Sequence, residues 1–304
     1  MSTLKICRIK LPKQDSSIGT SLPWRGAVHS GSNSLYLPDP AEGKVLLVDT
    51  EKDRIKDEVE GTGSNSMAQI CRDRDLVFLT GSALNEALVY RIGAMRNMLT
   101  LKFDFPPTGL SLDSDRDVLL ASGAEEFAFY RYPELKRLDF QRPAGKVRQA
   151  YFDTLEDAFV ILLQYPHRLM VIKSGESLSV MHDIGFGSEN INAVVICSVD
   201  RKVVLGTESG KILVTGFDSQ PQKLAASFKE PVAKLVYNSY VNHLYVMFRG
   251  SRHLAVVDME TDKVREVERC SSEISDIMFD ELHNKIYALL PSIPALEVYL
   301  DMGR

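Results

Sequence analysis

Seven short apolar segments recur along this chain at nearly constant intervals. They begin at Leu35, Leu76, Val118, Phe159, Val203, Leu244 and Ile286. Successive starts are separated by 41, 42, 41, 44, 41 and 42 residues. A regular period of this length indicates one supersecondary unit repeated in tandem, whose copies must bury each other's apolar faces. The repeat therefore constrains the fold more strongly than any other feature of the sequence.

The repeating unit is clearest in residues 232–267. Four short apolar runs, Ala233–Tyr237, Leu244–Phe248, Leu254–Asp258 and Val264–Val267, are separated there by the sequences NSYVN, RGSR and METD. Val, Leu, Tyr and Phe fill the runs while Asn, Ser, Gly and Asp fill the gaps, which is typical of a four-stranded antiparallel meander. No unit has a sustained apolar period of 3.6 residues, so helical repeats do not fit. Four strands in each unit of roughly 40–45 residues predict a β-propeller.

We therefore expect an all-β protein, a single seven-bladed β-propeller of four-stranded antiparallel blades over residues 1–304. The blades are expected at residues 24–60, 66–103, 108–140, 146–184, 191–228, 232–268 and 273–304. The seventh unit supplies only three strands, Ile274–Phe279, Lys285–Leu290 and Leu296–Leu300, whereas Leu4–Ile9 is left over at the other end of the chain. Residues 1–10 are therefore predicted to be the closing strand of the last blade, which would close the ring and remove an exposed sheet edge.

Two hairpins of the chain are similar to a known repeat. In 48–55 (VDTEKDRI) and 257–264 (VDMETDKV), an acidic turn joins two strands as in the third-to-fourth-strand hairpin of YVTN repeats. Over its whole length the chain resembles the seven-bladed WD-repeat and YVTN-repeat propellers. Acidic turns such as Asp113–Asp117 and Asp153–Asp157 agree with this, because Asp and Asn side chains cap tight turns. The Trp-Asp and Gly-His signatures of WD repeats are missing, so the resemblance implies the architecture and no subfamily.

Composition excludes several classes of partner. The formal net charge of −5 argues against a general nucleic-acid binder, which usually has a basic face. The longest apolar stretch, Ala158–Leu163, is too short for a membrane helix, and the charged N-terminus does not resemble a signal peptide. The four cysteines are widely spaced, at Cys7, Cys71, Cys197 and Cys270. We expect reduced thiols in a cytoplasmic or nuclear protein without a cofactor; a disulfide or a metal site is the alternative.

Candidate binding residues come from the loops expected on one face. In propellers of this kind, the loops between blades and the turns from second to third strand emerge together, and they are the default recognition surface. The sequences YPHR (165–168) and RGSRH (249–253) lie in such turns, and Trp24 lies in the Leu-Pro-Trp-Arg sequence that ends the long connection Lys10–Arg25. The predicted partner-binding residues are Trp24, Tyr165, His167, Arg168, Arg249, Arg252 and His253, because exposed Arg and aromatic residues often anchor interfaces. The alternatives are solvated loop residues and, for Trp24, a plug between the first and last blades.

Catalysis is not expected. The chain contains no GxSxG, HExxH, P-loop or Rossmann motif. The alternative is a lactonase-like or other sugar-derivative hydrolase, because seven-bladed lactonases resemble the YVTN propellers in fold. Such an enzyme would need acidic, His and Arg side chains at the channel mouth. Glu125, Glu126, Glu208, His167 and Arg249 are the residues that could supply them. The sequence thus favours a non-catalytic scaffold that binds a protein or peptide, with neither nucleic acid nor membrane as partner, by itself or in a multisubunit complex.

Overall fold

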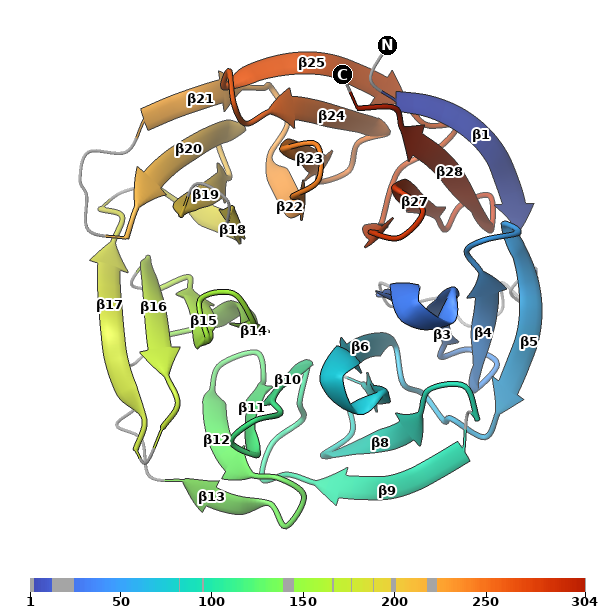
Figure 1. Cartoon of the computed structure of the whole chain (residues 1–304), viewed down its shortest axis with the longest axis vertical. Helices are drawn as coiled ribbons and strands as arrows, with labels where there is room; N and C mark the ends of the chain where they lie inside the picture. The colour runs from blue at the N-terminus through green and yellow to red at the C-terminus, as the bar shows by residue number, and fades with distance from the viewer. Residues whose placement is uncertain are drawn as a thin grey trace. The chain divides into compact units, whose positions relative to one another are not determined.

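The computed structural model describes residues 3–12, 25–81, 83–94, 96–138, 145–165, 167–175, 177–187, 189–197, 201–217 and 223–303. These residues form seven antiparallel sheets of four strands each (Figure 1). The predicted seven-bladed β-propeller is confirmed. The helical elements of the described residues are two single 3₁₀ turns, Ser30–Ser32 and Arg72–Arg74.

Six blades take four consecutive strands, and the seventh takes its fourth strand from the start of the chain. The first two blades are β2 (Ala27–His29), β3 (Ser34–Asp39), β4 (Lys44–Asp49), β5 (Arg54–Glu60), and β6 (Met67–Cys71), β7 (Leu76–Thr80), β8 (Glu86–Arg91), β9 (Arg96–Lys102). The third and fourth are β10 (Gly109–Asp113), β11 (Val118–Ser122), β12 (Phe127–Arg131), β13 (Lys136–Leu138), and β14 (Val147–Asp153), β15 (Ala158–Leu163), β16 (Arg168–Lys173), β17 (Ser179–Gly185). The fifth and sixth are β18 (Ile191–Cys197), β19 (Lys202–Thr207), β20 (Lys211–Gly216), β21 (Lys223–Ser227), and β22 (Val232–Asn238), β23 (His243–Phe248), β24 (His253–Asp258), β25 (Lys263–Arg269). The seventh is β26 (Asp276–Asp280), β27 (Lys285–Leu290), β28 (Ala295–Asp301) and β1 (Thr3–Lys10).

The chain divides into two compact parts. Unit 1 consists of Met1–Gly19, Val48–Lys56 and Ser188–Arg304, and it contains the fifth, sixth and seventh blades. Unit 2 consists of Thr20–Leu47 and Asp57–Gly187, and it contains the second, third and fourth blades with most of the first.

Burial follows the position of each strand within its blade. Every residue of β7, β11, β15, β23 and β27, all second strands, is buried. The outer strands β5 and β25 instead expose much of their length. Neighbouring blades of one unit interdigitate, as where Phe129 of the third blade packs edge-on against Phe159 of the fourth with ring centroids 5.1 Å apart. A two-faced apolar strand is stable only between two such neighbours, because both of its faces must leave water.

The turns between first and second strands share one backbone feature. The residue just before the second strand has a positive φ, between 49° and 56°, in each blade: Asn33, Asp75, Asp117, Asp157, Arg201, Asn242 and Asn284. Asn and Asp tolerate this left-handed conformation better than other side chains. Asp113 and Asp153 also accept hydrogen bonds from backbone N–H groups two and three residues ahead. The acidic repeats of the sequence therefore specify turn geometry.

The N-terminal strand completes the last blade, as predicted. β1 runs antiparallel to β28, from Thr3 opposite Asp301 to Lys10 opposite Ala295 (Figure 1). The Leu11 N–H extends the ladder with a 2.9 Å hydrogen bond to the Pro294 carbonyl oxygen. One part of β1 faces the core and another faces solvent, because Ile9 is 6% exposed whereas Leu4 is 49% exposed.

A buried carboxylate fastens β1 to β28. Glu297, on β28, is completely buried, and its carboxylate accepts hydrogen bonds from Lys5 and from Arg8, the latter at 2.7 Å. The hydroxyls of Ser271 and Tyr299 donate to the same group. Burial by itself would raise the pKa of Glu297, but the hydrogen bonds outweigh it and lower the pKa to about 2.

This pKa predicts how acid weakens the fold. Because the pKa of Glu297 is lower in the folded chain than the usual 4.5, its stabilisation is complete above pH 4.5 and is lost as pH falls toward 2. The loss is expected to reach about 2–3 kcal/mol, reduced by the partial exposure of Lys5 and Arg8. Urea unfolding of the wild type and Glu297→Gln at pH 6 and near pH 2.5 measures it. The stability gap between the two proteins should shrink at the lower pH, and a constant gap would contradict the assignment.

Candidate partner-binding surface

The structure places the predicted binding residues in two separate turns. Tyr165, His167 and Arg168 lie at the β15–β16 turn of unit 2. Arg249, Arg252 and His253 lie at the β23–β24 turn of unit 1. Trp24 lies outside the described residues.

The turn in unit 2 presents an aromatic pair beside a held arginine. The Tyr165 ring is 61% exposed, and its centroid is 5.3 Å from that of the His167 ring. Arg168 forms an ion pair with Asp183 on the neighbouring strand β17, with Nε 2.9 Å from Oδ1. The Arg168 side chain therefore lies along its own blade, and Tyr165 is the exposed contact group of this turn.

Three ion pairs join neighbouring loops in unit 1. Their members are Glu189 with Lys211 (2.7 Å), Glu208 with Arg249 (2.9 Å) and Glu230 with His253 (3.0 Å). The pKa of Glu230 is lowered, chiefly by its hydrogen bond with His253. Half-exposed pairs such as these contribute little to folding, so their main effect is to hold charged groups in defined positions.

A groove lies next to these pairs. It has a volume of about 390 Å³ and is lined by Gly250, Arg252, Ser271, Ser272, Glu273 and Ile293. These residues come from three loops: the β23–β24 turn, the β25–β26 connection and the β27–β28 turn. Gly250 adopts a φ of +65°, which turns the chain at the groove wall and would strain other residues. Of the lining residues, sequence reasoning selected only Arg252; the others were signalled only by belonging to loops of the same blade end.

A larger groove in unit 2 was not predicted. Its volume is about 660 Å³, and it lies at the turns between first and second strands of the second, third and fourth blades. Two of its lining residues, Asp113 and Asp157, form ion pairs with Arg116 at 2.9 and 2.6 Å. The two carboxylates are thus already occupied by a cation of the chain.

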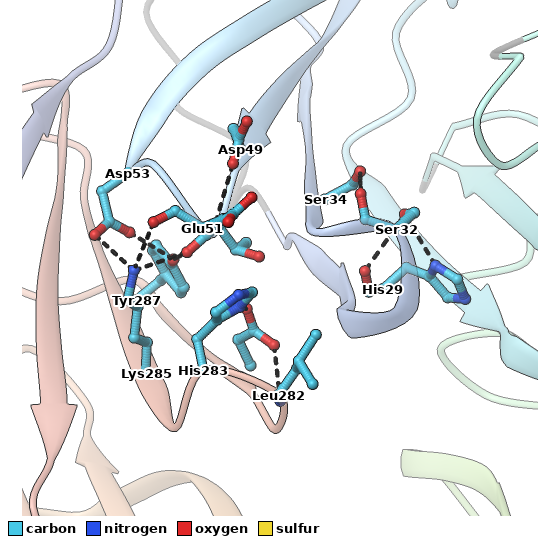
Figure 2. A network of polar contacts seen from close by, with 12 residues as sticks. His29, Ser32, Ser34, Asp49, Glu51, Asp53, Leu282, His283, Lys285 and Tyr287 are labelled. Carbon is cyan, nitrogen blue, oxygen red and sulfur yellow. Dashed lines mark hydrogen bonds and ion pairs between the residues drawn. The ribbon is translucent and has the colours of Figure 1, made fainter.

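A buried lysine holds the β4–β5 turn within unit 1. Lys285 on β27 is 8% exposed, and its ammonium donates to Asp53 Oδ2 at 2.7 Å and to the Thr50 carbonyl oxygen at 2.8 Å (Figure 2). The Tyr287 hydroxyl donates to the other oxygen of Asp53 at 2.8 Å. Burial and the Asp53 carboxylate raise the pKa of Tyr287, so its hydroxyl stays protonated. Every partner in this network is internal, which makes it structural.

The described part of the chain lacks the features of several other classes of site. No group of three or more His, Cys, Asp or Glu side chains there could hold a metal ion. None of the described segments forms a helix long and apolar enough to cross a membrane. Cys7, Cys71, Cys197 and Cys270 form no disulfide.

The residues named for a hydrolase are brought together only in part. Glu208 and Arg249 form the 2.9 Å ion pair described above. Glu125 and Glu126 lie in the β11–β12 turn of unit 2, and His167 lies in the β15–β16 turn of the same unit. In this pair the guanidinium of Arg249 neutralises the carboxylate of Glu208.

Comparison with known proteins places the fold among solved structures. No protein-family model matches the chain, and no curated protein matches its sequence. A Kuenenia stuttgartiensis hydrazine synthase structure superposes with a TM-score of 0.77 at 11% identity, over 95% of this chain and 98% of that chain. The β-propeller domain of Myceliophteria thermophila Cps50 (Swd1) superposes with a TM-score of 0.74 at 10% identity, over 94% and 98%. The shared feature is the propeller fold. At these identities the likeness extends to the fold alone, and one neighbour is an enzyme while the other is a propeller domain.

Proposed function

We propose that the chain is a non-catalytic interaction scaffold, which binds a protein or peptide through the loops that follow its second and fourth strands. The observation that carries this proposal is the groove beside Arg252. It is open to solvent, its walls are loops anchored on rigid blades, and the arginine in it has no ion-pair partner among the described residues. Arginine exposed in a concave surface is a common anchor of protein interfaces.

The short length of the described loops supports the same proposal. Nearly all of the described length lies in blades, and the described connections are short turns. Enzymes usually enclose their substrates with lids or added domains, because water must be excluded from the reacting groups. Short loops on regular blades suit a partner that binds from outside. We further propose a cytoplasmic or nuclear location, where the buried thiols of Cys71, Cys197 and Cys270 stay reduced.

Affinity capture tests the scaffold proposal. The wild type and Arg249→Glu/Arg252→Glu serve as baits in native extract, and the captured proteins are quantified by mass spectrometry. Reversing two exposed charges is expected to reduce specific partners at least about tenfold, since an anchoring arginine commonly contributes 2 kcal/mol or more.

The matched control reverses two other exposed charges of unit 1. Lys52→Glu/Lys263→Glu produces the same change in net charge at the opposite ends of the strands, and it should keep the partner list. Equal partner lists from the wild type and Arg249→Glu/Arg252→Glu would overturn the choice of surface. Gel filtration of native extract then distinguishes a transient partner from a permanent complex, because a subunit would co-elute at one fixed size.

A further inference from the structure

Positive charge gathers at one end of the blades in unit 1, although the whole chain carries −5. The loops and strand ends there contain six cations, Lys10, Lys211, Lys229, Arg249, Arg252 and Arg269, and five carboxylates, Glu189, Glu208, Glu230, Glu273 and Asp276. Four of the carboxylates form ion pairs, with Lys211, Arg249, His253 and, for Asp276, Lys234 of β22. Among the described residues, no ion pair involves Lys10, Lys229, Arg252 or Arg269, and all four side chains are exposed. This end of the unit therefore has cationic groups left for an external anion.

One of these cations, Arg252, lies in the groove described above. Arg252 lines it, and the backbone on both sides of Arg252 is fixed: the Cys270 N–H bonds the Arg252 carbonyl oxygen at 2.8 Å, and the Ile274 N–H bonds that of Ser251 at 2.9 Å. A guanidinium on a fixed backbone offers five N–H donors in a planar fork, which matches the two oxygens of a carboxylate. Ser272 also lines the groove, and its hydroxyl, which contacts that of Ser292, adds a neutral hydrogen-bonding group.

One lining residue of the groove has a large apolar side chain. Ile293, in the β27–β28 turn, is 38% exposed and lines the groove. The groove volume of about 390 Å³ is within the range of roughly 300–1,000 Å³ that small-ligand sites occupy, so it can hold a few residues of a peptide. A ligand that fills it needs an acidic group for Arg252 and an apolar group for Ile293 within a few bonds of each other.

We infer that this groove binds an acidic and apolar segment of a partner protein, with one carboxylate on Arg252 and an aliphatic side chain on Ile293. The inference rests on the proposed scaffold function and specifies the chemistry of its partner. A polypeptide fits better than a nucleic acid, because Glu273 lines the same groove and the whole chain carries a net charge of −5. The regular phosphates of a nucleic-acid strand would meet the Glu273 carboxylate, whereas a peptide can place its acidic residues to avoid it.

Fluorescence anisotropy with defined peptides tests the inference on the full-length chain. The probe is a fluorescein-labelled hexapeptide, Asp-Glu-Leu-Asp-Glu-Leu, and the matched peptide carries Asn and Gln in place of Asp and Glu. The acidic probe should bind at least about tenfold more tightly than the amide peptide, and its affinity should fall as NaCl rises from about 50 to about 300 mM. Arg252→Glu should weaken the acidic probe at least about tenfold. Glu273→Gln should strengthen it about twofold or more, because a repelling charge is removed.

Controls separate this inference from the scaffold proposal. Lys263→Glu, on the outer strand β25, should bind the probe as the wild type does, and equal melting temperatures show that all variants are folded. Equal binding of the acidic and amide peptides, or an unchanged affinity for Arg252→Glu, would overturn the inference. Stronger competition by a single-stranded oligonucleotide of about 12 nucleotides than by the peptide would replace it with nucleic-acid binding. If Arg249→Glu/Arg252→Glu loses captured proteins while the acidic probe does not bind the wild type, the scaffold proposal stands. The inference that the partner presents an acidic and apolar segment is then wrong.

Discussion

Deletion of residues 1–10 is expected to lower the free energy of unfolding by about 5 kcal/mol, which corresponds to a fall in melting temperature of about 8 °C. The deletion removes the β1–β28 ladder and the buried side chain of Ile9, which contributes roughly 1.5–3 kcal/mol. It also removes both cations that are paired with Glu297, but this carboxylate becomes exposed to water when β1 is absent, so the lost ion pairs add only about 1 kcal/mol. A calorimetric or circular-dichroism melt measures the effect.

The matched control keeps the strand and changes only its exposed side chains. Leu4→Thr/Ile6→Thr replaces two residues that are 49% and 39% exposed, so stability should change by less than about 1 kcal/mol. If the deletion variant melts at the wild-type temperature, β1 does not contribute to the stability of the seventh blade. If the double substitution is as damaging as the deletion, the ladder is not the source of the stability.

Replacement of Lys285 by Met is expected to lower the free energy of unfolding by about 3–4 kcal/mol. The substitution keeps the length of the side chain but removes the ammonium that neutralises Asp53 and bonds the Thr50 carbonyl oxygen (Figure 2). Asp53 then remains largely buried with Tyr287 as its hydrogen-bond donor, and breaking one side of a buried ion pair is strongly destabilising. Asp53→Asn should have a similar cost and keeps the positive φ of 51° that Asn tolerates.

A double-mutant cycle gives this prediction a specific signature. Lys285→Met/Asp53→Asn removes both charges, so it should cost about 2 kcal/mol less than the sum of the single substitutions. The measurement is urea unfolding of the four proteins at neutral pH. Additivity within about 0.5 kcal/mol would mean that the pair does not interact, and the buried network would then be wrong.

Strands and turns could be predicted from local pattern because each depends on a few neighbouring residues. The spacing of the second strands located β7 and β11 at their observed first residues and the other five within one residue. In six of the seven blades the Asp or Asn before the second strand specifies a left-handed turn residue, and Arg201 takes this position in the fifth. The leftover strand at the N-terminus could be assigned to the last blade by counting strands, since an unpaired sheet edge is unfavourable.

The candidate surface could be predicted only at the level of loops. The sequence RGSRH identified an exposed, arginine-rich turn, and Arg252 does line the groove. The partners of the other charged residues were not predictable, because Glu208 and Arg249 are 41 residues apart and meet only through the packing of neighbouring blades. Ser271 and Ile293 carry no local signal for a groove, since its walls come from three loops that approach one another only in the folded chain.

The amino-acid sequence by itself determined the repeat, the number of blades and the geometry of their turns, because periodic apolar runs and acidic turn residues act through local backbone preference. Tertiary structure alone decided which charges are buried and paired. Glu297 lies in the apolar run ALEVYL, and the sequence pattern alone does not show whether its side chain is buried or exposed. In the folded chain the strand β1 covers Glu297 and supplies Lys5 and Arg8, so its carboxylate is fully buried and has a low pKa. Arg252 differs from its paired neighbour Arg249 for the same reason: the electrostatic energy of each depends on distances between loops that lie far apart in the chain.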